Sequence, residues 1–340
     1  MSSAACIPVE QPAWFWELLG RTPLAEGESD AIHGQEVVVQ DGLPRVRRLT
    51  DAGQVQTADV FGYKWSRRET FDSPASRARA REWLIERYGD LARQQWLQDG
   101  AVVVDAGCGA GLSGLELLAD RLPHLRYLGV DVSTAVDMAR ARFAERGVPG
   151  AFLQADLMDL PLPAGCADVV FSEGVLHHTP STRDALAAVT RLLAPGGRIL
   201  FYVYRRKGPV REFTDDLLRD RLHGLPPEAA WKALEPLTRL GIALGELHAT
   251  VDLPEPIDLL GIPAGKIDVQ RLFYWHVAKA FYRPDLSFDE MNHINYDWYH
   301  PTYAHRQSPD EVRSWCADLG LAVERERVEE AGITIVARRG

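Results

Sequence analysis

A short apolar run that breaks into closely spaced glycines constrains the fold more than any other feature of this sequence. The stretch is VVVDAGCGAGLSG, residues 102–114. Its apolar start is typical of a buried parallel strand, and LSGLELLADRL after it has the period of a helix. Glycines at such a junction let backbone N–H groups approach a ligand without clashes from Cβ atoms. The stretch therefore predicts a ligand site at the carboxyl end of a parallel strand.

The same alternation of strand and helix continues to residue 204 and returns near the C-terminus. Apolar runs predict strands at 101–107, 126–132, 151–157, 167–175 and 198–204, and helical periods predict helices at 81–97, 112–122, 133–147 and 182–197. Residues 308–320 predict a helix with Ser308 as N-cap, and Gly332 lies in the turn of a final hairpin. Together these elements predict a parallel sheet with helices on both faces and an antiparallel last strand.

Three segments that differ in composition and in their pattern of strand-like and helix-like stretches predict the domain organisation. Residues 1–98 are rich in aromatics without clear alternation, and we expect this N-terminal segment and its helices to contribute to a cap. Residues 99–204 and 306–340 are the expected ligand-binding core. Residues 205–305 interrupt the rhythm with helical stretches and an aromatic, histidine-rich segment, and we expect them to form a lid over the substrate.

Composition narrows the class of protein. Hydrophobic residues make up 46% of the 340 residues, which is enough for a full core. The net charge of −10 argues against a general nucleic-acid binder. The four cysteines are far apart, and no apolar run is long enough to span a membrane. We therefore expect a reduced, cytoplasmic protein without nucleic-acid or membrane partners.

The glycines fit two ligands, and the residues up to the second strand do not separate them. Gly109, Gly111 and Gly114 spell G-x-G-x-x-G, which is typical of a site that binds NAD. Both NAD and S-adenosylmethionine need bare backbone here and an acid that accepts hydrogen bonds from the ribose hydroxyls. Asp131 lies 20 positions after Gly111 and suits either ligand.

Three further features favour S-adenosylmethionine. Asp105 precedes the glycines, where an amino-acid ammonium or its bound water benefits from a carboxylate and a dinucleotide needs none. Asp156 follows the third strand, where it can accept a hydrogen bond from the exocyclic amine of adenine. The terminal hairpin does not belong to a dinucleotide fold of six parallel strands.

With these motifs the chain resembles the class I S-adenosylmethionine-dependent methyltransferases over roughly residues 85–205 and 305–340. The matching motifs are Asp105-x-Gly107-x-Gly109-x-Gly111, Asp131, Asp156, DVVFSEGVLHH and LAPGGRILF. The resemblance implies an α/β fold with a Rossmann-like sheet of seven strands in the order 3-2-1-4-5-7-6, strand 7 antiparallel, and a helical cap.

The flanks of this core resemble those of one subgroup. FGYKW at 61–65 and NYDWYHPTYAHRQSPDEV at 295–312 look like the flanks of bacterial methyltransferases from natural-product and surface-polymer pathways. The resemblance therefore implies a role in bacterial secondary metabolism.

The resemblance and the residue types predict the cofactor site. We expect aromatic faces to stabilise the sulfonium, an arginine to meet the cofactor carboxylate, and a backbone N–H to meet the adenine. The candidate cofactor residues are Asp105, Gly107, Gly109, Gly111, Asp131, Asp156, Leu157, Ser172, Tyr63, Trp65 and Arg67.

The segment after the fourth strand holds the catalytic candidates. Glu173, His177 and His178 lie where the family faces the donor methyl group. A histidine here suits a general base because its ordinary pKa is near neutral. In a helical segment the two histidines diverge by about 100°, so at most one faces the cleft. We expect His177 to do so; the alternative is that both histidines only hydrogen-bond the loop.

Basic and aromatic side chains in the lid are the candidates for substrate contacts. They are Tyr204, Arg205, Arg211, His276, His293, Tyr296 and Tyr303. The arginines suit a carboxylate or phosphate, unless they form a solvated face. The rings either cover the substrate or form the core of the lid. The histidine spacing matches no standard ligand set, so we expect no metal.

The function predicted from sequence is methyl transfer to a small molecule, with S-adenosylhomocysteine as product. One alternative is an intramolecular cyclase, in which the amine of S-adenosylmethionine attacks its own side chain. That reaction expels methylthioadenosine and leaves a cyclic amino acid such as azetidine-2-carboxylate. A regulator that binds S-adenosylmethionine without turnover and a nicotinamide oxidoreductase are further alternatives. A homodimer is compatible with the sequence.

Overall fold

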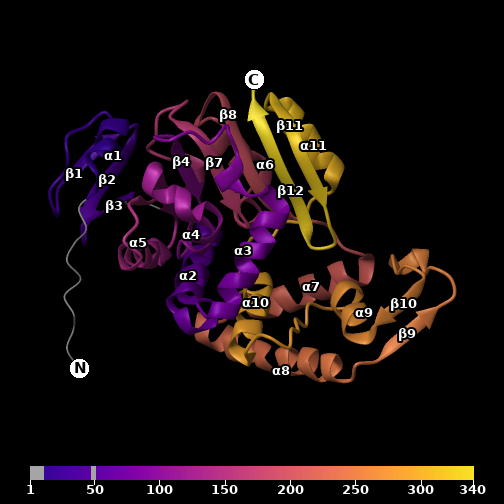
Figure 1. Ribbon diagram of the computed structural model, residues 1–340. Helices are drawn as coiled ribbons and strands as arrows, with labels where there is room; N and C mark the ends of the chain where they lie inside the picture. Colours follow the sequence, from indigo (N-terminus) through magenta and orange to yellow (C-terminus); the bar gives the residue numbers. More distant parts are fainter. Residues whose placement is uncertain (1–10, 47–50) are drawn as a thin grey trace.

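A ten-stranded mixed sheet forms the centre of the molecule (Figure 1). The computed structural model describes residues 11–46 and 51–340. In their order across the sheet the strands are β1 (Ser29–Ile32), β2 (Gln35–Gln40), β3 (Leu43–Val46), β6 (Ala151–Gln154), β5 (Arg126–Asp131), β4 (Val102–Ala106), β7 (Ala167–Glu173), β8 (Leu193–Tyr204), β12 (Gly332–Arg339) and β11 (Leu321–Val328).

The part of the sheet from β6 to β11 positions the functional site. The strands β6, β5, β4, β7 and β8 are parallel, and β12 is antiparallel to both β8 and β11. Counted along the chain from β4 within this sheet, they follow the order 3-2-1-4-5-7-6. The order reverses at β4, and ligands of open α/β sheets bind at such a point.

The predicted number of seven strands is wrong for the whole sheet, because β1, β2 and β3 extend it beyond β6. β2 and β3 form a tight hairpin whose turn residues Asp41 and Gly42 both have positive φ. β3 then pairs in parallel with β6 through Arg45 and Gln154. An Asp-Gly pair between two strand-like runs is itself a hairpin signal, and it lies in the segment for which the sequence suggested no strands.

Helices cover both faces of the sheet and form a further layer at one end of it. The described helices are α1 (Ala13–Leu18), α2 (Ala52–Ser66), α3 (Pro74–Tyr88), α4 (Leu112–Leu118), α5 (Ala135–Glu145), α6 (Thr182–Thr190), α7 (Pro209–Leu222), α8 (Pro227–Glu246), α9 (Val269–His276), α10 (Phe288–Tyr299) and α11 (Pro309–Asp318).

Two hydrophobic cores lie on the two faces of the sheet. On one face Val189 of α6 and Val312 of α11 pack with the side chains of the central strands, and α1 adds Phe15. On the other face Leu84 of α3 and Phe143 of α5 do the same, together with α4. Alternate residues of each strand enter the two cores, which is why the central strands are apolar throughout.

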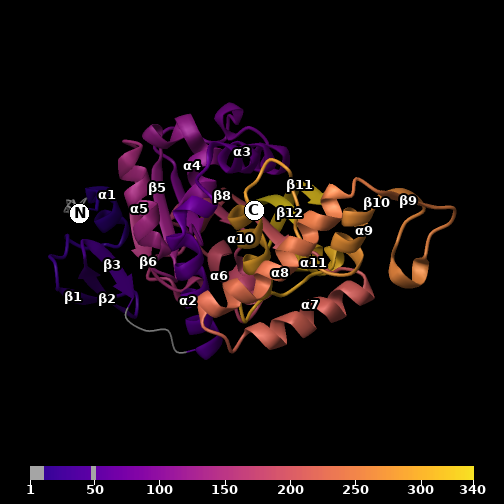
Figure 2. The ribbon, with the colours of Figure 1, turned by 90° about the horizontal axis from the view of Figure 1, so that it is seen from below.

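The lid layer consists of α7, α8, α9 and α10, which lie below the sheet in Figure 1 together with α2. A two-stranded hairpin of β9 (Thr250–Leu253) and β10 (Gly265–Asp268) projects from this layer, as Figures 1 and 2 show. Residues 205–305 therefore supply four lid helices, and α2 and α3 of the N-terminal segment meet them. None of the described helices is long and apolar enough to cross a membrane.

Some predicted element ends are wrong. The helix predicted at 182–197 ends at Thr190, because residues from Leu193 already belong to β8. The helix predicted at 81–97 begins at Pro74 and ends at Tyr88, where Gly89 takes a positive φ. Thr134 is the N-cap of α5, and the hydroxyl of Ser133, which the sequence suggested as cap, donates to Asp131.

Two other details of the sequence prediction are confirmed. Ser308 and Glu311 form a reciprocal capping box at the start of α11, with Pro309 in its first turn. The final segment forms the β11–β12 hairpin, but Gly332, which was predicted to lie in the turn, is the first residue of β12.

Candidate functional site

A cavity of about 710 Å³ lies between the carboxyl ends of the central strands and the lid. The predicted site residues that line it are Trp65, Gly107, Gly109, Asp131, Asp156, Leu157, Glu173, His178, Tyr204, Arg211 and His293. Those that do not line it are Tyr63, Arg67, Asp105, Gly111, Ser172, His177, Arg205, His276, Tyr296 and Tyr303. One space thus joins the glycine loop to the lid.

The loop after β4 depends on glycine at two positions. Gly107 and Gly109 have φ of +89° and +50°, which L side chains rarely adopt. A Cβ at Gly107 would lie 2.3 Å from the side chain of Val175, and one at Gly109 would lie 2.7 Å from that of Trp65. The bare backbone is therefore required where it faces the cavity.

Asp131 ends β5 and connects the loop to the second strand. One carboxylate oxygen accepts the N–H of Gly109 at 2.8 Å, and the other accepts the N–H and hydroxyl of Ser133 at 2.8 and 2.6 Å. Burial raises the pKa of Asp131, and these hydrogen bonds oppose that rise. The oxygen that accepts the Gly109 N–H has capacity for a further donor, such as a ribose hydroxyl.

Asp156 follows β6 at the same end of the sheet. Its Oδ1 accepts the N–H of Met158 at 2.9 Å and lies 3.3 Å from the side-chain amide nitrogen of Gln54. Burial raises its pKa. Leu157 is the next residue and lines the cavity beside it. This corner offers a carboxylate and an amide to a polar ring such as adenine.

Asp105, Gly111 and Ser172 support the loop from behind the cavity wall. Asp105 accepts the hydroxyl of buried Tyr127 at 2.6 Å, and burial raises its pKa to about 7. Gly111 precedes α4 with φ of +71°. Ser172 donates to the carbonyl of Ala106 at 2.8 Å. The expected direct contact of these three residues with the cofactor is not supported by their placement.

The two flanking motifs, FGYKW on α2 and NYDWYH on α10, meet across the cavity. Lys64 and Asp297 form an ion pair at 2.9 Å, and both line the cavity. Trp65 packs against His293 with ring centroids 5.5 Å apart. Although burial raises the pKa of Asp297, the ammonium of Lys64 lowers it overall. Segments more than 200 residues apart thus form one wall of the site.

Tyr63 and Arg67 lie on the outer side of this wall. The Arg67 guanidinium stacks on Trp231 at 4.1 Å from the ring centroid, and Tyr63 packs against Tyr296. These contacts tie α2 to the lid helices α8 and α10. Both residues therefore have a packing role in this structure.

The structure places His178, and not His177, at the cavity wall. His178 Nδ1 lies 2.6 Å from the carbonyl oxygen of Tyr303. Because a carbonyl only accepts, Nδ1 carries the proton and Nε2 has a free lone pair. Nε2 has no partner among the described residues, and burial lowers the pKa of His178 to about 4. His178 is thus a neutral imidazole with one unused acceptor.

His177 and Glu173 have different surroundings. The ring of His177 is fully buried against Tyr204, with centroids 3.7 Å apart. Glu173 lines the cavity, but its oxygens accept the N–H of Trp83 at 3.0 Å and the hydroxyl of Tyr88. Burial raises the pKa of Glu173. Of the three catalytic candidates, only His178 combines contact with the cavity and an unused acceptor.

Four of the substrate candidates lie away from the cavity. Arg205 pairs with the turn between β11 and β12, and His276 ends α9. Tyr296 accepts or donates a hydrogen bond at 2.9 Å to His300. Tyr303 donates its hydroxyl to Asp51.

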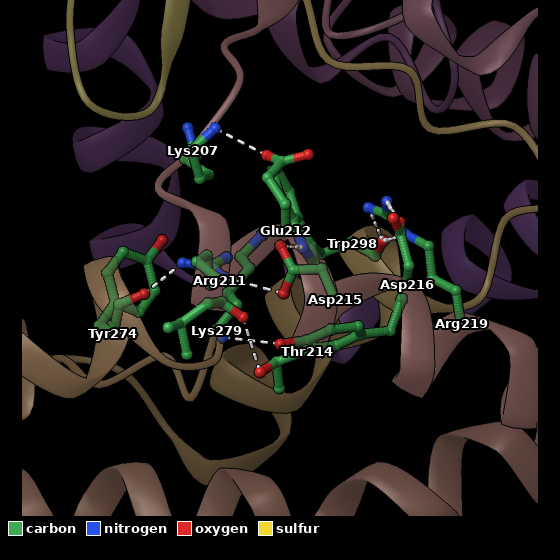
Figure 3. A network of polar contacts seen from close by, with 12 residues as sticks. Lys207, Arg211, Glu212, Thr214, Asp215, Asp216, Arg219, Tyr274, Lys279 and Trp298 are labelled. Carbon is green, nitrogen blue, oxygen red and sulfur yellow. Dashed lines mark hydrogen bonds and ion pairs between the residues drawn. The ribbon is translucent and has the colours of Figure 1, made fainter. Parts of the chain in front are cut away.

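Arg211 lines the cavity, but its charge is already balanced. Its Nε lies 2.8 Å from Oδ1 of Asp215, whose Oδ2 accepts the indole N–H of Trp298 at 2.8 Å (Figure 3). Arg211 also donates to the carbonyl of Tyr274. The residue that the sequence favoured as an anion contact thus belongs to a closed, buried network.

Sequence reasoning missed several lining residues with polar side chains. Among them are Gln54, Lys64, Arg79 and Lys279. Lys64 lies within FGYKW, and Lys279 interrupts the apolar run VAKAF, residues 277–281. The apolar neighbours predict that the segment is buried, and a lysine within it is then buried too. Since lysine is almost never fully buried unless its charge is paired, such a lysine is a candidate for a functional amine. Within residues 11–46 and 51–340, no group of three or more His, Cys, Asp or Glu side chains is arranged to hold a metal ion.

Residues 104–201 match the family model described as a methyltransferase domain. Over this stretch the chain is similar to methyltransferase domains. The stretch includes the glycine loop, Asp131, Asp156 and His178, and S-adenosylmethionine is its cofactor. The sheet order and the site geometry agree with the match, which ends just before the lid.

Curated relatives also match this part of the chain. A trans-aconitate 2-methyltransferase of Acidovorax sp. (strain JS42) is 30% identical over 178 residues, 52% of this chain. One of Methylobacterium nodulans is 38% identical over 155 residues, 45% of this chain. The chain spans 62% and 56% of the length of these two relatives. Magnesium protoporphyrin IX methyltransferase of Synechocystis, solved with bound S-adenosylhomocysteine, aligns with a TM-score of 0.46 at 14% identity, covering 85% of this chain and all of that one.

Proposed function

We propose that this chain transfers the methyl group of S-adenosylmethionine to a small acceptor held in the cavity. The observation that carries the proposal is the continuity of the cavity, which runs from Gly109 and Asp131 to Tyr204 and Lys279. When bound, S-adenosylmethionine supplies an electrophilic methyl group. The chain supplies position and exclusion of water, which are the main requirements of such a transfer.

The residues at the sheet end fit this cofactor. Gly107 and Gly109 bring bare backbone to the cavity at positions where a Cβ would clash with Val175 and Trp65. The Asp131 oxygen that accepts the Gly109 N–H has capacity for a ribose hydroxyl. Asp156 and Gln54 suit the exocyclic amine and a ring nitrogen of adenine. Trp65 lies with its indole edge against the loop at Gly109, and its ring already holds the ammonium of Lys64 at 4.3 Å from the centroid, the kind of contact that a sulfonium cation would make.

His178 is the proposed general base for an acceptor that must lose a proton. The carbonyl of Tyr303 holds the proton on Nδ1, so the buried and unpartnered Nε2 is the ring nitrogen able to accept a proton from a substrate that reaches it. Its low pKa keeps the imidazole neutral at physiological pH. A carboxylate acceptor needs no base, and His178 would then only orient it.

The relatives named trans-aconitate 2-methyltransferase make trans-aconitate the first acceptor to test. A role in bacterial secondary metabolism, a cytoplasmic location and a homodimer stay predictions. Intramolecular cyclisation of the cofactor also stays an alternative, and its nucleoside product separates it from methyl transfer.

Calorimetry with S-adenosylhomocysteine and NAD tests the cofactor site, and an assay with methyl-labelled S-adenosylmethionine tests the transfer. We expect the purified chain to bind S-adenosylhomocysteine and not NAD, and to pass label to trans-aconitate or another small acid. Binding of NAD alone would contradict the proposal, and label found only on the protein would contradict a small acceptor.

A further inference from the structure

The lid end of the cavity holds more positive charge than its carboxylates balance. Four cations surround the ring of Trp298 within 6 Å of its centroid, namely Lys207, Arg211, Arg219 and Lys279. Arg211 is paired with Asp215, and Arg219 donates to the backbone carbonyl of Trp298. The two lysines remain to be explained.

Among the described residues Lys279 is buried without an ion pair or hydrogen bond for its ammonium, and Asp297, the carboxylate that attracts its charge most, is already paired with Lys64. Lys279 is only 7% exposed and lines the cavity. Its Nζ lies 4.7 Å from the Trp298 centroid, and within the described parts of the chain it has no hydrogen bond or ion pair. An isolated ammonium in such surroundings is destabilising, so the chain keeps it at a cost in stability.

Lys207 approaches the same ring from the other side of Arg211 (Figure 3). Its Nζ donates to the backbone carbonyls of Glu330 and Ala331 in the turn between β11 and β12. Carbonyl oxygens solvate the ammonium but carry no charge to neutralise it. Lys207 therefore adds a second uncompensated cation to the wall that Trp298 forms.

The cluster is connected to the proposed base through stacked rings. Trp298 packs on Tyr204 with centroids 4.3 Å apart, and Tyr204 lies 5.4 Å from His178. All three residues line the cavity. An acceptor that reaches from His178 to the lysines must therefore extend past one aromatic ring.

We propose that Lys279 and Lys207 form a subsite for a carboxylate of the acceptor, seated over Trp298 and remote from His178. The inference rests on the proposed function, because it names the chemistry of the acceptor in that same cavity. A carboxylate fits because two ammonium groups face the space, while the nearby carboxylates Asp297 and Asp215 are already paired with Lys64 and Arg211. Arg211 also fixes Trp298 through Asp215. The acceptor is thus an elongated acid and not a neutral metabolite.

Calorimetry with succinate, its uncharged analogue succinamide, and inorganic phosphate tests the subsite. The titrations use the full chain with and without S-adenosylhomocysteine. We expect succinate to bind about tenfold or more tightly than succinamide, as a charge-assisted contact implies. Equal affinities for succinate and succinamide would overturn the inference, and phosphate binding as tightly as succinate would overturn the carboxylate assignment.

Lys279→Met and Lys207→Met should each remove the preference for succinate while leaving the affinity for S-adenosylhomocysteine unchanged. Exposed Lys266 on β10 provides the matched control, and Lys266→Met should keep both the preference for succinate and the affinity for S-adenosylhomocysteine.

Lys279→Met should also melt no lower than the natural chain, because it removes an unpaired charge. A lower melting temperature would make Lys279 a structural residue, and a fall in S-adenosylhomocysteine affinity would assign the lysines to the cofactor; either result overturns the inference.

The outcomes separate this inference from the proposed function. No binding of S-adenosylhomocysteine to the natural chain would contradict the proposed function, whatever succinate does. Binding of S-adenosylhomocysteine without preference for succinate would contradict the carboxylate subsite alone.

Discussion

Asp131 is the residue on which the cofactor site depends most directly. It was identified from its place at the end of the second strand, and in the structure its carboxylate holds both the glycine loop and Ser133. Such a role follows from the sequence because strand ends are predictable from apolar runs. The hydrogen bonds that fix the loop do not follow, since they depend on the backbone conformation of Gly109.

Asp131→Ala should weaken binding of S-adenosylhomocysteine by about 1.5–3 kcal/mol, or about 10- to 150-fold, because charge-assisted hydrogen bonds are lost. Isothermal titration calorimetry measures the change. Asp184→Ala, an exposed residue of α6, is the matched control and should bind normally. Equal affinities of the two variants would remove Asp131 from the site.

His178 and His177 are adjacent in sequence and separate in function. His178→Gln should slow turnover of an acceptor that must lose a proton by about 10²–10⁴-fold, with cofactor affinity unchanged. His177→Gln should keep more activity. Since the pKa of His178 is about 4, the base is neutral above that value, and the rate should stay level as pH falls from 8 to 5. An inflection near 6.5 that disappears in His178→Gln would contradict the lowered pKa, and equal activity of His178→Gln and the natural chain would contradict His178 as the base.

Lys279 gives the unfolding free energy a dependence on pH. Asp297 and Asp215 attract its charge and Arg211 and Lys64 repel it, but burial dominates and lowers its pKa to about 7. In the unfolded chain the amine has its ordinary pKa near 10.5, so between these values the unfolded state binds more protons. Stability should therefore rise with pH above about 7. Denaturant titrations at pH 7 and 9 should show a smaller rise in Lys279→Met, and an equal rise would contradict the buried amine.

At the scale of elements, α2 and α10 close the cavity through contacts that sequence reasoning did not reach. The motifs FGYKW and NYDWYH were recognised separately, yet the Lys64–Asp297 pair that joins them was missed. Nothing in one sequence tells which of its charged residues pair across 233 positions. The hairpin of β2 and β3 was missed for another reason, because its short strands have little alternation.

Asp297→Asn should destabilise the fold by about 3 kcal/mol, because it leaves the ammonium of Lys64 buried and unpaired. The double variant Lys64→Met/Asp297→Asn should recover most of that loss in chemical denaturation. Glu228→Gln, which breaks the exposed pair with Lys232 on α8, is the control and should leave stability unchanged. If the losses in unfolding free energy of the two single variants simply add in the double variant, the pair does not couple α2 to α10.

At the scale of the whole molecule, one cavity lies between the sheet, whose structure could be predicted from the sequence, and the lid, whose packing could not. The strands from β4 to β8 and the glycine loop could be predicted because burial and backbone strain leave strong local patterns. The residue range of the lid could be predicted, but its tertiary contacts could not, because they depend on packing between α2, α10 and the segment of Lys279. His177 was preferred over His178 for the same reason: the choice depends on which ring Tyr204 covers.

The most direct test of the central claim is the nucleoside that the purified chain makes from S-adenosylmethionine, measured by mass spectrometry with and without a small carboxylic acid acceptor. The account predicts S-adenosylhomocysteine that forms only when an acceptor is present, together with a methylated acid. Methylthioadenosine formed without any acceptor would contradict methyl transfer and favour cyclisation of the cofactor.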